Sequence, residues 1–95
     1  MASDKEYLEY VLELLRKVEG VTVKKMMGEY LLYCGGVLFG GVYDNRFLVK
    51  KTPSVEEFGL GEELPYDGAK PMLLVDTEDP DEIKIIVERV VSDLT

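Results

Sequence analysis

Apolar side chains recur at helical spacing near both ends of the chain, and this pattern predicts a helix at each end. The first helix covers about residues 4–19 and begins at Ser3, which forms with Glu6 the Ser-x-x-Glu pattern of a capping box. The second covers about residues 80–94 and begins behind Asp79, a residue type that commonly caps a helix. Its apolar stripe consists of Ile83, Ile86, Val87, Val90, Val91 and Leu94.

Between the two helices, runs of aliphatic and aromatic residues predict three strands. They cover about residues 29–34, 37–43 and 46–50. The pairs Gly35-Gly36 and Asp44-Asn45 separate these runs, and both pairs tolerate the positive φ of tight hairpin turns. The three strands should therefore form an antiparallel meander.

The remaining segments complete the predicted architecture. Residues 21–25 are either a short strand or a connector, and residues 51–71 form a loop with at most a single helical turn. A buried strand follows near residues 71–75. The order helix, meander, loop, strand, helix predicts one α+β domain spanning 1–95, a two-layer sandwich of an antiparallel sheet and two helices.

The meander has two apolar faces. Two-residue turns would place Val42 opposite Phe47, and the same face would carry Leu31, Tyr33, Leu38, Gly40 and Val49. The other face would carry a predicted interaction surface made of Tyr30, Leu32, Phe39, Tyr43 and Leu48. A turn of another length would exchange the two faces. The glycine pair Gly40-Gly41 within a strand indicates a bulge, or a helix lying close to the sheet.

Two helices can cover only one face of so small a sheet, which has a consequence for partners. We expect the other face to be covered by a second copy of the chain, as a homodimer, or by a protein partner. The alternative is that loop 51–71 folds over this face, with Tyr66 and Phe58 as the cover, and leaves a monomer. We expect Met26 and Met27 to fill the core where the chain enters the sheet.

The charge distribution bears on nucleic-acid binding. The net charge of −8 opposes phosphate, so we do not expect the domain to bind nucleic acid alone. Residues 24–51 nevertheless hold five basic against two acidic residues. This possible basic patch consists of Lys24, Lys25, Arg46, Lys50 and Lys51. With the neighbouring aromatic residues, it supports an alternative function as a nucleic-acid-binding accessory.

The sequence offers little catalytic chemistry. Histidine is absent, which removes the usual general base near neutral pH, and the single Cys34 excludes an internal disulfide. A thiol or redox function of Cys34 is a further alternative, although we expect a small apolar strand residue. The acidic run Asp76–Glu82 lacks the glycine and final acid of a calcium loop. We therefore expect no enzyme activity, cofactor or metal.

Hydropathy bears on the compartment. The chain begins with charged residues rather than the apolar stretch of a secretory signal. No run approaches the length of about 18 apolar residues that a membrane span requires. We expect a cytoplasmic protein.

The stretch 25–33, Lys-Met-Met-Gly-Glu-Tyr-Leu-Leu-Tyr, resembles the signature of the N-terminal domain of the TfoX/Sxy family. Lys24 takes the basic position, where arginine is common, and Met27 stands where phenylalanine is common. The segments 46–50 and 64–72 continue the resemblance, while the helical second domain of longer members has no counterpart here.

The resemblance implies a two-layer fold and a non-enzymatic regulatory or protein-interaction module. In some bacteria such proteins are linked to competence regulation, as transcription co-regulators beside the cyclic-AMP receptor protein.

Overall fold

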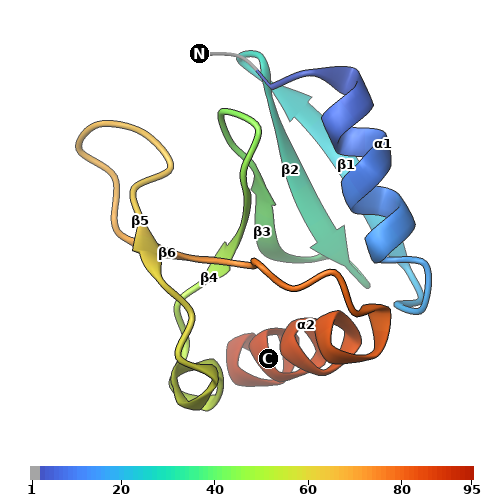
Figure 1. Ribbon diagram of the computed structural model, residues 1–95, viewed down its shortest axis with the longest axis vertical. Coiled ribbons are helices and arrows are strands. Elements are labelled where there is room, and N and C mark those ends of the chain that lie inside the picture. The colour runs from blue at the N-terminus through green and yellow to red at the C-terminus, as the bar shows by residue number, and fades with distance from the viewer. Residues whose placement is uncertain (1–2) are drawn as a thin grey trace.

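Two helices lie against one side of a six-stranded antiparallel sheet, which confirms the predicted two-layer α+β sandwich (Figure 1). The computed structural model describes residues 3–95. In chain order the elements are α1 (Lys5–Leu14), β1 (Val21–Met26), β2 (Glu29–Cys34), β3 (Val37–Val42), β4 (Phe47–Lys50), the 3₁₀ helix η1 (Pro53–Phe58), β5 (Glu62–Glu63), β6 (Met72–Leu74) and α2 (Pro80–Leu94). The strand order is β1-β2-β3-β4-β6-β5, so β1 and the two-residue β5 form the edges of the sheet.

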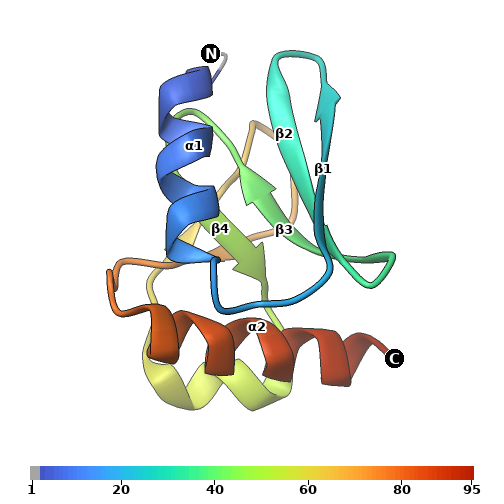
Figure 2. The ribbon, with the colours of Figure 1, turned by 90° about the vertical axis from the view of Figure 1, so that its right-hand side faces the viewer.

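The core lies between the sheet and the helices, which run crosswise to one another (Figure 2). The helices contribute Leu8 and Val11 from α1 and Ile83, Ile86, Val87 and Val90 from α2. Burial of each such side chain typically stabilises the fold by about 1.5–3 kcal/mol. Every buried residue of both helices thus belongs to the same apolar cluster as the sheet.

Helix α2 confirms the prediction made from its caps. It begins at Pro80, and the Asp79 carboxylate accepts a hydrogen bond of 3.0 Å from the amide of Asp81. This bond satisfies one of the free amides of the first turn. The acidic run before α2 is thereby explained as a helix start.

Helix α1 differs from its prediction at both ends. Its cap residue is Asp4 rather than Ser3, because the Ser3 hydroxyl instead donates to the Glu29 carboxylate over 2.6 Å. The helix ends at Leu14, and turns with i→i+3 bonds continue to Val18. Since those turns still direct Leu15 and Val18 into the core, the apolar spacing alone did not reveal the change.

Both predicted hairpin turns form, and the chain contains a third hairpin turn. Both residues of Gly35-Gly36 and of Asp44-Asn45 have positive φ, as the prediction requires. Met27 and Gly28 form another turn of this kind, with φ of 52° and 83°, between β1 and β2. Met27 is consequently 95% exposed and Met26 45% exposed, so the prediction that they fill the core is wrong.

A bulge in β3 determines which strand residues face the helices. The predicted pairs Val42–Phe47, Gly40–Val49 and Leu38–Tyr33 all form. However, the consecutive residues Leu32 and Tyr33 of β2 pair with Gly40 and Leu38 of β3. This pairing skips Phe39, which has no partner on β2. The bulge predicted from the glycine pair is therefore present, and it interrupts the alternation on which the two predicted faces rested.

As a result of the bulge, about half of the residues predicted for each face of the sheet lie on the other face. The helix-covered face carries Tyr30, Leu32, Phe39, Val42, Phe47, Val49 and Leu73. The opposite side, which we call the open face, carries Leu31, Tyr33, Leu38, Tyr43, Leu48, Lys50 and Met72. The predicted interaction surface is thus divided between the two sides of the sheet.

Gly40 is the position at which the bulge tolerates no side chain. A Cβ at Gly40 would overlap the carbonyl oxygen of Leu48 and lie 2.9 Å from the Cα of Val49. We expect Gly40→Ala to lower the free energy of unfolding by about 1–3 kcal/mol, because adjoining backbone must move. Denaturant unfolding followed by circular dichroism measures the change.

Gly61→Ala is the matched control. No atom lies within 4 Å of a Cβ at Gly61, so this variant should unfold within about 0.5 kcal/mol of the parent. Equal stability of the two variants would show that the bulge does not depend on glycine.

Candidate functional site

The predicted interaction surface does not exist as one surface. Tyr30, Leu32 and Phe39 are buried in the core beneath the helices, so they are unavailable to a partner. This placement corrects the prediction, and its cause is the unpaired Phe39. Leu48 lies on the open face but is also fully buried, so Tyr43 is the one member of the predicted surface that is partly exposed there.

An apolar strip occupies the part of the open face nearest β1. It consists of Met26, Leu31, Tyr33 and Leu38, which come from β1, β2 and β3. All four side chains keep part of their surface in contact with solvent. The exposed Met27 adjoins the strip in the β1–β2 turn. Sequence analysis placed both methionines in the core and therefore missed this strip.

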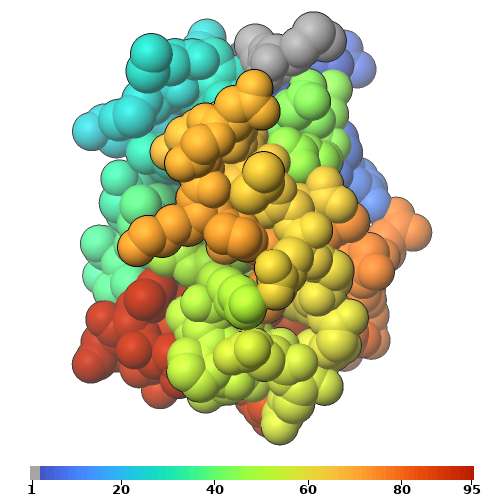
Figure 3. All heavy atoms as spheres, turned by 90° about the vertical axis from the view of Figure 1, so that its left-hand side faces the viewer, coloured from blue at the N-terminus to red at the C-terminus, as the bar shows by residue number. Residues whose placement is uncertain are grey.

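The segment 64–71 crosses the middle of the molecule on the side of the open face (Figure 3, gold to orange). It brings the ring of Tyr66 to 6.4 Å from that of Tyr43. The expected cover by Tyr66 is therefore present. Phe58 is placed differently, because it packs against the core and the Arg89 guanidinium lies 5.0 Å from its ring. The loop thus covers one part of the open face.

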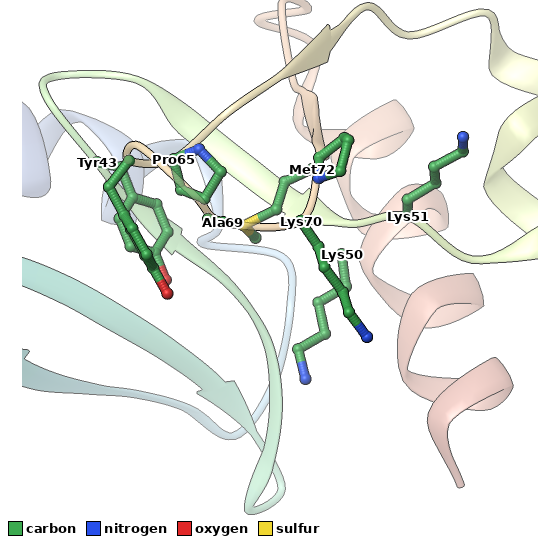
Figure 4. A pocket seen from close by; sticks show the side chains of 9 residues that line it. Tyr43, Lys50, Lys51, Pro65, Ala69, Lys70 and Met72 are labelled. Carbon is green, nitrogen blue, oxygen red and sulfur yellow. The ribbon is translucent and has the colours of Figure 1, made fainter.

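A cavity of about 370 Å³ lies between this segment and the sheet (Figure 4). Its lining combines aromatic, apolar and basic side chains: Tyr43, Lys50, Lys51, Pro65, Tyr66, Ala69, Lys70, Pro71 and Met72. Burial raises the pKa of the Tyr43 hydroxyl above its usual value, so this side chain stays neutral near pH 7. The charge of the cavity wall therefore comes from its lysines.

Arg46 fastens the segment that forms the outer wall of the cavity. Its guanidinium pairs with the Glu63 carboxylate at 2.9 Å and donates to the carbonyl oxygens of Leu64 and Pro65 at 3.0 and 3.4 Å. Its Nε also donates to the carbonyl of Tyr43 over 3.2 Å. One side chain thus connects the β3–β4 hairpin to the start of the 64–71 segment.

The five residues of the possible basic patch do not form one positive surface. Arg46 and Lys51 are paired with acids, the latter with Glu62 at 2.7 Å. Lys24 and Lys25 follow each other on the edge strand β1 and therefore point to opposite sides of the sheet. Lysines on an edge strand also discourage pairing with another chain.

Lys50 is the remaining patch residue, and it shares the cavity with Lys70. Sequence analysis did not single out Lys70, which lies 20 positions away in the loop. The available signal was the motif at 64–72, which resembles the TfoX/Sxy pattern and contains this lysine. Only the folded loop shows that both lysines line one cavity.

Cys34 lies beside the core on β2, partly exposed, and its Sγ donates to the Glu19 carbonyl over 3.4 Å. Within residues 3–95, no three Cys, Asp or Glu side chains gather closely enough to form a metal site. Over the same residues, neither helix has the length and apolar character needed to cross a membrane.

Two helices on one face of an antiparallel sheet, with a cavity under a loop on the other, define a small α+β sandwich domain. The chain matches the model of the TfoX N-terminal domain over residues 13–92 and belongs to that family. It is 37% identical over 78 residues to the "Uncharacterized 12.7 kDa protein in trpE 5'region" of Spirochaeta aurantia. That alignment covers 80% of this chain and 68% of the relative. The resemblance seen in residues 24–33 is thereby confirmed.

The contacts of Arg46 predict an unequal effect of two charge removals. Arg46→Gln should lower the free energy of unfolding by about 1.5–3 kcal/mol, because it leaves a part-buried carboxylate and two carbonyls without their donor. Lys51→Gln breaks a more exposed pair, which solvent screens, and should cost clearly less than Arg46→Gln. Thermal and denaturant unfolding measure both, and equal losses would contradict the role of Arg46 as a fastener.

The divided basic residues and the net charge of −8 lead to a prediction about DNA. We expect no binding of duplex DNA by the isolated domain at physiological salt in a mobility-shift assay. Binding with a dissociation constant of about 1 μM or lower, which weakens steeply as salt is added, would overturn this expectation.

Proposed function

We propose that this domain is a non-enzymatic interaction module that acts in regulation and binds a protein partner through the apolar strip of its open face. The observation that carries the proposal is the strip itself, formed by Met26, Leu31, Tyr33 and Leu38 and extended by Met27. A sheet face in contact with water normally carries polar side chains, whereas four apolar side chains stand together here beside Thr22 and Lys24.

The charges beside the strip favour a partner with an acidic rim over a second copy. Lys24 stands opposite Leu31 on the same face, and Lys50 lies on the other side of the strip. A symmetric dimer formed through this face would bring two lysine-bearing surfaces together. An acidic rim around an apolar centre would complement the same lysines.

The size of the strip fits a moderate, reversible association. Each apolar side chain that becomes buried contributes about 1.5–3 kcal/mol at most. Association costs several kcal/mol in lost motion and ordering. Four or five partly exposed side chains therefore support binding of the strength typical of regulatory contacts.

Family membership supports the regulatory part of the proposal. The TfoX N-terminal domain matches most of the chain. In some bacteria, proteins of the TfoX/Sxy type are linked to competence regulation, as the resemblance implies. The relative from Spirochaeta aurantia is itself uncharacterized, so the identity of the partner rests on experiment. A cytoplasmic location would suit this role.

The strip predicts a loss of binding on its disruption. Met27→Glu combined with Leu31→Glu should weaken retention of the partner from lysate of the source cells by about tenfold or more, since charge enters an apolar contact. Met27→Glu alone tests the same surface without risk to the fold, because Met27 is 95% exposed. Quantitative affinity capture with mass spectrometry compares the variants.

Ile85→Glu is the control, because Ile85 is 45% exposed and lies on α2, away from the open face. The proposal requires a protein that the parent and the Ile85 variant retain and both strip variants lose. It fails if the strip variants retain every protein that the control retains. It also fails if the parent is a dimer by light scattering that the strip variants dissociate, since a second copy would then occupy the strip.

A further inference from the structure

The cavity under the 64–71 segment is chemically distinct from the apolar strip. Its volume of about 370 Å³ falls within the range of sites that hold small molecules. It is separated along the sheet from β1, because its strand residues come from β4 and β6 and from the end of β3. A ligand in the cavity is therefore compatible with a protein bound to the strip.

Two ammonium groups in the cavity lack a carboxylate partner. Within residues 3–95, neither Lys50 nor Lys70 has an acidic group within 4.0 Å, although both belong to a chain of net charge −8. Figure 4 shows their side chains running in the same direction, whereas Lys51 points away, toward its partner Glu62. An anion that contacts both ammonium groups would supply the negative charge that they lack.

The wall next to the lysines suits a planar ring. Tyr43 and Tyr66 stand with their rings tilted by 52° at 6.4 Å, and Tyr66 remains 65% exposed. Met72 and Ala69 add apolar surface between the tyrosines and the lysines (Figure 4). Exposed tyrosine rings offer a stacking surface for an aromatic or heteroaromatic ring.

The wall is held in position before any ligand arrives. Arg46 fixes the chain at 63–65, Pro65 is buried, and the amide of Ala69 donates to the Tyr66 carbonyl over 3.2 Å to close a turn. A preformed cavity lowers the entropy that binding must offset.

From these observations we infer that the cavity binds a phosphate monoester of a planar heteroaromatic compound, the chemistry of a nucleoside monophosphate. The two ammonium groups of Lys50 and Lys70 match the double negative charge of the phosphate. The ring stacks on the exposed face of Tyr66. Binding is non-covalent, and no bond of the ligand is broken.

Adenosine monophosphate is the probe, titrated into the whole chain and followed by amide chemical shifts in NMR. We expect saturable shifts at residues of the cavity with a dissociation constant below about 1 mM. Inorganic phosphate and adenosine each supply half of the chemistry, so both should bind at least about tenfold more weakly.

The double variant Lys50→Gln/Lys70→Gln should weaken binding by about tenfold or more, and Tyr66→Ala by several-fold. Lys5→Gln/Lys84→Gln removes the same charge from the helices and should leave binding unchanged. Circular dichroism verifies the fold of each variant.

Three results would overturn the inference. The first is an absence of saturable shifts with adenosine monophosphate up to about 10 mM. The second is an equal loss of binding in the two double-lysine variants, which would indicate only bulk charge. The third is loss of the protein partner, without any nucleotide binding, when Lys50 and Lys70 are replaced; the lysines would then serve the partner's acidic rim. A failure of the strip variants in the capture assay leaves these outcomes unaffected.

Discussion

The unpaired Phe39 in β3 is the constraint on which the packing of this domain depends. If the β2–β3 pairing were continuous, Tyr30 and Leu32 would point away from Val42 and Phe47, and the residues of the present core would be divided between the two sides of the sheet. The bulge turns all of these side chains toward the helices. It also leaves the shorter row of Leu31, Tyr33 and Leu38 on the other side, where only part of the surface is covered.

The bulge in turn depends on two glycines. A side chain at Gly40 would overlap the neighbouring β4 backbone, and a Cβ at Gly41 would lie 2.6 Å from the carbonyl oxygen of Tyr30 and 2.7 Å from the ring of Tyr43. The absent side chain at Gly41 lets the Tyr43 ring lie against this position, and Tyr43 also lines the cavity. Both the core and the candidate ligand site thus require glycine at positions 40 and 41, where there is no room for a side chain.

Local signals in the sequence predicted those parts of the fold that local interactions determine. Asp79 and Pro80 marked the start of α2, and the turn pairs at 35–36 and 44–45 determined the meander. The true end of α1 escaped prediction because turns with i→i+3 bonds preserve nearly the same apolar spacing. The exposure of Met27 escaped prediction because methionine rarely adopts positive φ, so its apolar side chain was assigned to the core.

The candidate site was predictable only in part, because it combines distant segments. Alternation along β3 correctly placed Tyr43 on the open face, and Lys50 was singled out as a member of the possible basic patch. Lys70 reaches them through a loop whose path depends on the non-local bonds of Arg46, and strand periodicity contains no information about such a path. Arg46 itself was expected to be a surface charge, yet its partners make it part of the scaffold.

The unequal edges of the sheet bear on how copies of this domain behave at high concentration. β1 offers six residues of unpaired backbone with Lys24 and Lys25, whereas β5 offers only two, both glutamates. Opposite charge would draw the two edges together, but two residues cannot template a six-residue strand. Head-to-tail growth of the sheet into a filament through these two edges therefore lacks a repeating contact.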